Sequence, residues 1–110
     1  MAIRAPKEKD ILRSIRQYLD LRRVLYLRNN SGALRDASNR PVRFGQPGSA
    51  DLILCFGGRF VSLEVKGPRG KLTELQEGWA RAVRLAGGVA LVVRSVDELA
   101  DALRRLEAEV

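Results

Sequence analysis

Residues 51–66 hold the feature that most constrains the fold, two runs of strand-forming residues joined by Gly57-Gly58. A Gly-Gly pair between such runs predicts a two-residue β-hairpin, because these tight turns need positive φ angles. With that turn, Asp51 falls directly opposite Glu64. Alternate residues of the two strands then share one wholly apolar face, which must be the core side; it consists of Leu52, Leu54, Phe56, Val61, Leu63 and Val65.

The other face of the hairpin is charged. Lys66 lies two residues beyond Glu64 and therefore points to the same side as Glu64 and Asp51. Directly opposed like charges destabilise a sheet, whereas a divalent cation between two carboxylates would remove the repulsion. Acidic residues at strand ends can also be an ordinary solvated pair. The hairpin alone leaves both interpretations open.

Composition excludes several classes of chemistry. The chain has one cysteine and no histidine, which rules out an internal disulfide, cysteine-based zinc clusters and every histidine-dependent active site. Its 110 residues suit one domain with a real core. No apolar run approaches the roughly 20 residues of a membrane span, and the first nine residues lack an apolar signal core. We therefore expect a single-domain, soluble, cytoplasmic protein.

The positive charge is concentrated in the first half of the chain. Residues 1–50 contain 11 basic and 4 acidic residues, whereas residues 51–110 contain 9 of each, so the first half carries the whole net charge of +7. Such an excess, dominated by arginine, predicts a polyanionic partner, most simply nucleic acid. A basic balance that serves only solubility is the alternative.

The first half should contain a helix, a strand and a long arm. A helical stripe predicts a helix over residues 7–21, with Glu8 on its inward side. A short strand over 24–27 leads into an irregular basic arm at about 29–48, with room for one short strand near 42–44. A simple surface hairpin is the alternative. The arm carries Arg35, Arg40 and Arg43.

The second half should form a βαβ unit. A basic loop with Arg69 and Lys71 precedes a helix over 73–86, which opens with a Thr73–Gln76 capping box. The helix is followed by an apolar strand over 89–93, which should run parallel to strand 60–66, and by a last helix that ends near Ala108. We expect a mixed sheet with helices on both faces. The predicted apolar face of helix 73–86 is Leu75, Trp79, Ala82, Val83 and Ala86.

Asp51 followed by Glu64-Val65-Lys66 resembles the D…E-x-K signature of the PD-(D/E)XK nuclease superfamily. Together with Glu8, Gln76 and two short segments, the pattern is similar to the virus-type replication-repair nuclease (VRR-NUC) family over about residues 7–94. The segments are Arg28-Asn29-Asn30-Ser31-Gly32 and Gly48-Ser49-Ala50-Asp51. The resemblance implies an α/β restriction-endonuclease-like core of the order αβββαβ with a C-terminal helix.

The resemblance also implies a reaction, hydrolysis of DNA phosphodiesters with Mg²⁺ or Mn²⁺. It assigns metal binding to Glu8, Asp51, Glu64 and the Val65 carbonyl, and catalysis to Asp51, Glu64, Lys66 and Gln76. Lys66 would orient or help deprotonate the attacking water. DNA contacts are expected from Arg28, Asn29, Asn30, Arg35, Arg40, Arg43, Arg69 and Lys71.

The small stand-alone members of that family come from phages and bacteria, resemble Holliday-junction resolvases and tend to be homodimers. The resemblance therefore implies branched DNA as the substrate, a homodimer, and a phage or bacterial origin. Flap or other repair nucleases and RNA nucleases remain open. So do a non-catalytic DNA-binding subunit and a protein-interaction module that shares the fold.

Overall fold

The computed structural model describes residues 5–109. Val110 lies outside the described part, and so do residues 1–4, which belong to the stretch that was predicted to lack a signal core. Helices and strands follow one another as α1 (Glu8–Leu21), β1 (Leu25–Arg28), β2 (Gly32–Arg35), β3 (Pro41–Phe44), β4 (Leu52–Phe56), β5 (Arg59–Val65), α2 (Glu74–Leu85), β6 (Val89–Val93) and α3 (Val96–Ala108). No helix within residues 5–109 is both long and apolar enough to cross a membrane.

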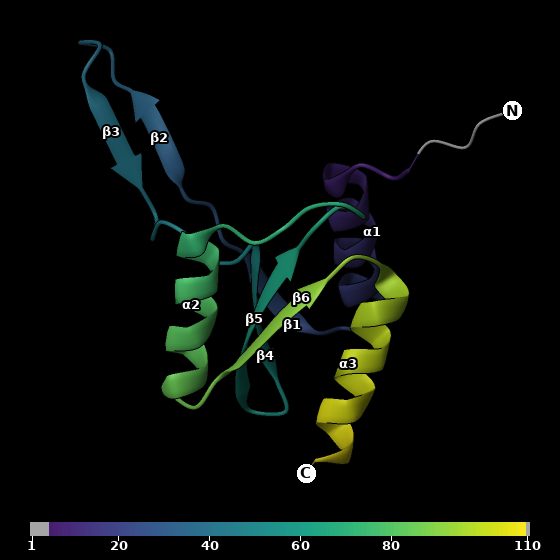
Figure 1. Ribbon diagram of the computed structural model, residues 1–110. Coiled ribbons are helices and arrows are strands. Elements are labelled where there is room, and N and C mark those ends of the chain that lie inside the picture. The colour runs from purple at the N-terminus through teal and green to yellow at the C-terminus, as the bar shows by residue number, and fades with distance from the viewer. Residues whose placement is uncertain (1–4, 110) are drawn as a thin grey trace, which may run out of the picture.

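The main sheet has four strands in the order β1-β4-β5-β6. Strand β5 pairs antiparallel with β4 and parallel with β6, as expected of the β5-α2-β6 unit. Figure 1 shows α2 on one side of this sheet and α1 and α3 on the other. The predicted mixed sheet with helices on both faces is confirmed.

The hairpin that organises the sequence forms in the predicted register. Phe56 pairs with Arg59 and Leu52 pairs with Leu63, which brings Asp51 and Glu64 to the same end of the hairpin. Gly57 and Gly58 have φ angles of 58° and 77°, the left-handed conformation that a two-residue turn requires. The turn chemistry therefore fixes which residues of β4 and β5 face each other.

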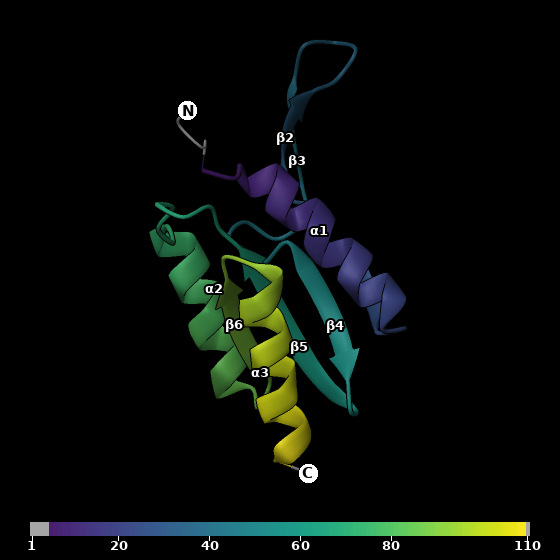
Figure 2. The ribbon, with the colours of Figure 1, turned by 90° about the vertical axis from the view of Figure 1, so that its right-hand side faces the viewer.

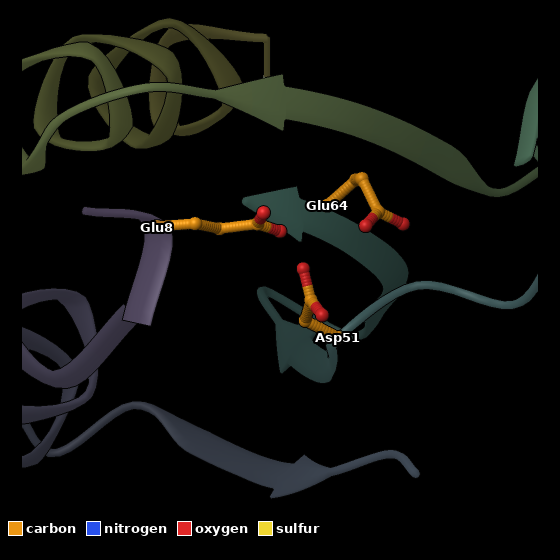
Figure 3. Close-up of side chains that lie close together, drawn as sticks. All are labelled: Glu8, Asp51 and Glu64. Carbon is orange, nitrogen blue, oxygen red and sulfur yellow. The ribbon is translucent and has the colours of Figure 1, made fainter. Parts of the chain in front are cut away.

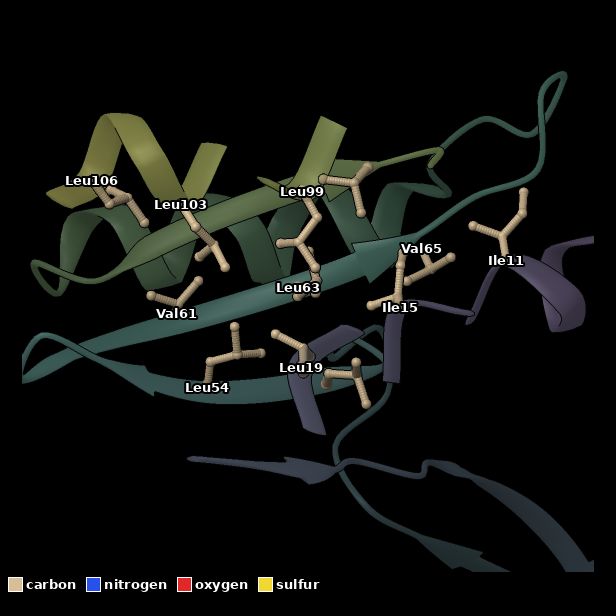
Figure 4. Packing of buried hydrophobic residues seen from close by; sticks show 12 residues of the cluster. Ile11, Ile15, Leu19, Leu54, Val61, Leu63, Val65, Leu99, Leu103 and Leu106 are labelled. Atoms are coloured by element: carbon tan, nitrogen blue, oxygen red, sulfur yellow. The ribbon is translucent and has the colours of Figure 1, made fainter. Parts of the chain in front are cut away.

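The main core lies between the sheet and the pair α1 and α3 (Figure 4). Each strand of the hairpin sends alternate apolar side chains to this face, and every one of them is buried except Phe56, which is partly buried. The helices supply matching stripes at helical spacing. The stripes are Ile11, Ile15 and Leu19 from α1, and Leu99, Leu103 and Leu106 from α3.

A smaller cluster lies under α2, where Ala80 and Val83 pack against Ala90 of β6. Trp79 joins it, and its indole N–H donates to the Ser62 hydroxyl at 2.8 Å. The predicted apolar face of α2 was wrong at three positions, because Leu75 is 63% exposed and Ala82 and Ala86 are also exposed. The face of α2 that meets the sheet instead holds Trp79, Ala80 and Val83, which lie three, four and seven residues after Gln76.

The arm was predicted to be irregular, and that prediction was wrong. Strands β2 and β3 form a separate two-stranded antiparallel sheet, in which Gly32 pairs with Phe44, and Figure 1 shows it projecting from the body of the molecule. The Asp36 carboxylate accepts hydrogen bonds from the backbone N–H groups of Ser38 and Arg40, each at 2.9 Å. This turn chemistry closes a surface hairpin, so the alternative interpretation of the arm was correct.

Candidate metal centre

Three carboxylates from three separate parts of the chain meet at one end of the hairpin. Glu8 comes from the first turn of α1, Asp51 from the residue before β4, and Glu64 from β5 (Figure 3). One oxygen of each lies within 4.8 Å of the others. Glu8 is exposed, Asp51 is half-buried and Glu64 is buried. The structure thus places together the three acidic residues that the sequence predicted as metal ligands.

Asp51 is held by hydrogen bonds on both sides. Its Oδ2 atom accepts from the Val65 backbone N–H at 2.7 Å, and its carbonyl accepts from the Asn29 backbone N–H at 2.8 Å. The first bond sets the Val65 peptide beside the carboxylates. It also ties the two strands together at the point where their ladder ends.

The predicted DNA contact Asn29 is engaged inside the protein. Its side-chain nitrogen donates to the Ser49 hydroxyl at 2.7 Å and to the Ala50 carbonyl at 2.8 Å. Asn29 therefore fixes the turn that delivers Asp51. Sequence reasoning did not assign this positioning role, and it missed Ser49 as a partner, although both lie in segments that it had singled out.

Gly48 explains the spacing of the segment before Asp51. It has a φ angle of 80°, and a Cβ atom there would lie 2.4 Å from the carbonyl oxygen of Leu75. Only glycine allows this backbone to approach the start of α2 so closely. The Asp51 turn and the first turn of α2 are thereby held against each other.

Gln76 joins the start of α2 to the carboxylates. Its side-chain nitrogen donates to Glu64 Oε1 at 3.3 Å, while its side-chain oxygen accepts from the Thr73 backbone N–H at 3.0 Å. The Thr73 hydroxyl in turn accepts from the Gln76 backbone N–H at 3.2 Å. One side chain therefore completes the predicted capping box and also orients Glu64.

Lys66 directly follows β5 and is only 8% exposed. Its backbone N–H donates to the Val93 carbonyl at 3.0 Å, and the turn closed by the Gly70 N–H on the Gly67 carbonyl covers its stem. A Cβ atom at Gly70 would lie 3.3 Å from Lys66 Cδ. The Arg94 guanidinium donates to the Gly67 carbonyl, a support for this loop that sequence reasoning missed.

Burial raises the pKa of the Glu64 carboxyl to about 8, and the nearby Asp51 adds to this rise while Lys66 opposes it. Glu64 is only 6% exposed, so water cannot offset its charge well. Clustered oxygen ligands of this kind fit a hard divalent cation such as Mg²⁺ or Mn²⁺. The arrangement is therefore chemically suited to cation binding.

The basic residues predicted to contact DNA lie in three separate places, and all of them are exposed. Arg28 ends β1 and is followed after Asn29 by the exposed Asn30. The arm carries its three arginines, of which Arg35 donates to the Asn39 carbonyl at 3.0 Å and Arg40 lies 3.8 Å from Asp36. Arg43 is the third, and Arg69 and Lys71 lie in the loop after β5.

Comparison with known proteins identifies the fold. No protein-family model matches the sequence, and no curated protein matches it either. Among solved structures, the chain is similar to a protein described as "VRR_NUC domain protein", with a TM-score of 0.63 and 13% sequence identity. The match covers 94% of this chain and 89% of the other. The predicted likeness to VRR-NUC proteins is confirmed at the level of the fold.

The raised pKa of Glu64 gives a pH-dependent stability in metal-free buffer. The folded state holds this proton more tightly than the unfolded chain, whose glutamate has a pKa near 4.5. The contribution of Glu64 to the free energy of unfolding is therefore fully present below pH 4.5 and is lost as pH rises through about 8. Glu64→Gln removes this loss. Urea unfolding should therefore show the free energy of unfolding of the variant rising relative to that of the wild type as pH increases from 4.5 to about 8.

Glu77→Gln, which removes one exposed acidic charge from α2, is the matched control. Its difference from the wild type should stay nearly constant over the same pH range. If the free energy of unfolding of Glu64→Gln relative to the wild type also stayed constant, or fell as pH rose, the assigned environment of Glu64 would be contradicted.

Proposed function

We propose that this protein is a metal-dependent DNA endonuclease that hydrolyses phosphodiester bonds at the site formed by Glu8, Asp51 and Glu64. The observation that carries the proposal is the meeting of these carboxylates within 4.8 Å, at the end of the hairpin that leads into buried Lys66. The fold shared with a VRR_NUC domain protein supports it. An acidic residue that served only solubility would not be buried, as Glu64 is, beside a second carboxylate at a desolvation cost.

The residues divide naturally into metal ligands and groups that act on water. The three carboxylates and the Val65 carbonyl would hold Mg²⁺ or Mn²⁺. When bound, the cation would polarise the scissile phosphate and offset the negative charge that develops on it. Gln76 would keep the Glu64 carboxylate in one orientation, because its donated hydrogen bond and its place in the cap fix both ends of the link.

Lys66 would act on the attacking water. Its stem is enclosed by the loop at Gly67–Gly70, so its ammonium group has little freedom and can hold the water or help to take its proton. A lysine is a point donor on a flexible chain, and burial of the stem restricts that chain. The role needs proximity to the carboxylates, which the Glu64-x-Lys66 spacing on β5 provides.

The DNA contacts are proposed for the exposed cations. Arg28 and Asn30 flank Asn29, the residue that positions Asp51. The β2–β3 arm carries Arg35, Arg40 and Arg43. The loop after β5 would contribute Arg69 and Lys71. Contacts of this kind bind the phosphate backbone and do not read sequence, so we propose that the substrate is recognised by shape, as branched DNA.

Two-fold assembly fits a branched substrate, because residues 5–109 hold a single carboxylate cluster and a four-way junction needs two symmetric cuts. An exposed apolar surface supports a homodimer. Leu25, Leu27 and Phe60 are exposed and line a shallow depression with Ile53 and Cys55 on β1, β4 and β5. Apolar patches of this kind mark protein–protein contacts.

Lys66→Ala should lower the turnover of DNA cleavage by about 100-fold or more while leaving Mg²⁺ affinity intact, because the lysine acts on water and not on the metal. Single-turnover cleavage and calorimetric titration of Mg²⁺ measure the two quantities separately. A folded variant that lost Mg²⁺ binding, or one that kept wild-type turnover, would contradict this assignment.

The substrate and the assembly can be tested together. We expect light scattering to give a dimer at micromolar concentration, and labelled four-way junctions to be cut in Mg²⁺ at paired positions symmetric about the junction, with no cleavage in EDTA. Leu27→Glu places a charge on a side chain that is 57% exposed within the apolar patch, so it should give a folded monomer that loses the paired cuts.

Leu85→Glu is the matched control, since Leu85 is 87% exposed on α2 and outside the patch. It should remain dimeric. A wild-type monomer that cuts flaps and leaves junctions intact would contradict the proposed substrate and assembly, while leaving the carboxylate site as the place of cleavage.

A further inference from the structure

A groove of about 380 Å³ runs along α1 and the end of β1, outside the carboxylate cluster. Four of the side chains that line it are cationic, namely Lys9, Arg13, Arg16 and Arg28, and one is acidic, Asp20. Of these, only Arg28 belongs to a sequence segment singled out above. The cations of α1 were counted in the net charge of the first half but were not recognised as a surface.

The charges of the groove follow from helical spacing. Positions 9, 13, 16 and 20 recur every three or four residues and therefore lie along one face of α1. Asp20 accepts a hydrogen bond from the Tyr26 hydroxyl at 2.9 Å, and Asp10 outside the groove lies 3.6 Å from Arg13 in an exposed, weak pair. The groove keeps a positive excess after these contacts.

Arg16 carries a specific sign of a missing partner. Its Nε atom is buried and has no hydrogen-bond partner among the described residues. A guanidinium is always charged and offers only donors, and a buried donor without an acceptor is costly. Arg16 also lines the groove, so a shift of its side chain toward an anionic oxygen there would supply the acceptor that the buried position lacks. Arg16 thus adds an observation beyond the charge of the groove.

The groove starts beside the carboxylates. Lys9 follows Glu8 in the chain, and Arg28 precedes Asn29, whose backbone N–H is bonded to the Asp51 carbonyl. From this end, α1 runs diagonally across the molecule in Figure 2. At 1.5 Å per residue, the distance from Lys9 to Asp20 is about 16 Å. A duplex whose axis ran along α1 would present about five phosphates of one strand over that length, one per 3.4 Å of axis.

We infer that this groove binds the phosphate backbone of one DNA strand next to the cleavage site, with Arg13, Arg16 and Arg28 contacting successive phosphates. The inference rests on the proposed nuclease function and deepens it, because it assigns the path of the substrate across α1. The arm and the loop after β5 would then contact other parts of the same branched DNA.

The test compares two double variants that remove the same charge. Arg13→Gln with Arg16→Gln changes the groove, whereas Arg81→Gln with Arg104→Gln changes exposed arginines of α2 and α3 outside it. Binding to a fluorescein-labelled 20-base-pair duplex is measured in EDTA, which prevents metal-dependent cleavage, over a series of salt concentrations. Arg13→Gln alone is a third variant, since Arg13 is exposed and its loss should not disturb folding.

We expect the groove variant to flatten the slope of log K against log salt by about 1.8, which is about 0.9 for each lost phosphate contact, and the single variant to flatten it by about half as much. The control variant should keep the wild-type slope. Equal slopes for the groove and control variants, or no duplex binding by the wild type, would overturn the inference. The same wild-type preparation is assayed for cleavage in Mg²⁺, so a groove-dependent slope without cleavage would refute the nuclease function alone.

Discussion

The burial of Glu64 opposite Asp51 is the constraint on which the rest of this structure depends. A carboxylate that is 6% exposed loses most of its hydration, and a second carboxylate nearby adds repulsion to that loss. Lys66 offsets part of this cost, yet the pKa of Glu64 still rises to about 8. The fold therefore keeps at its centre an arrangement that costs stability, which is typical of sites whose geometry serves function.

The surrounding elements show how such a cost is contained. Strand β5 is hydrogen-bonded to neighbours on both sides, and its apolar residues are buried beneath the pair α1 and α3. Gln76 links the cap of α2 to Glu64, and Gly48 lets the Asp51 turn press against the same helix. Asn29 and Val65 hold the two sides of Asp51. Each carboxylate is thus fixed by an element that the hydrophobic core already orders.

The sequence predicted the parts of the fold that local chemistry decides. Gly57-Gly58 determined the hairpin register, and the capping-box spacing determined the start of α2. The β2–β3 hairpin was only the alternative interpretation, because an aspartate side chain closes its turn. The face of α2 was misassigned because tertiary contacts of Gln76 and Trp79 set its rotation. Asn29 was expected to face DNA, but an amide can bond to backbone as readily as to phosphate. The groove along α1 depends on how β1 meets that helix, which periodicity cannot show.

Metal-dependent stabilisation tests the central claim most directly. If the carboxylates are arranged for a divalent cation, added Mn²⁺ or Mg²⁺ should raise the unfolding temperature of the wild type near neutral pH. The free energy of unfolding should rise by about 2.7 kcal/mol at a metal concentration 100 times the dissociation constant of the metal. Glu64→Gln should lose most of this shift, since it removes a buried ligand charge and keeps the shape. Equal shifts in both proteins, or no shift in either, would contradict the account.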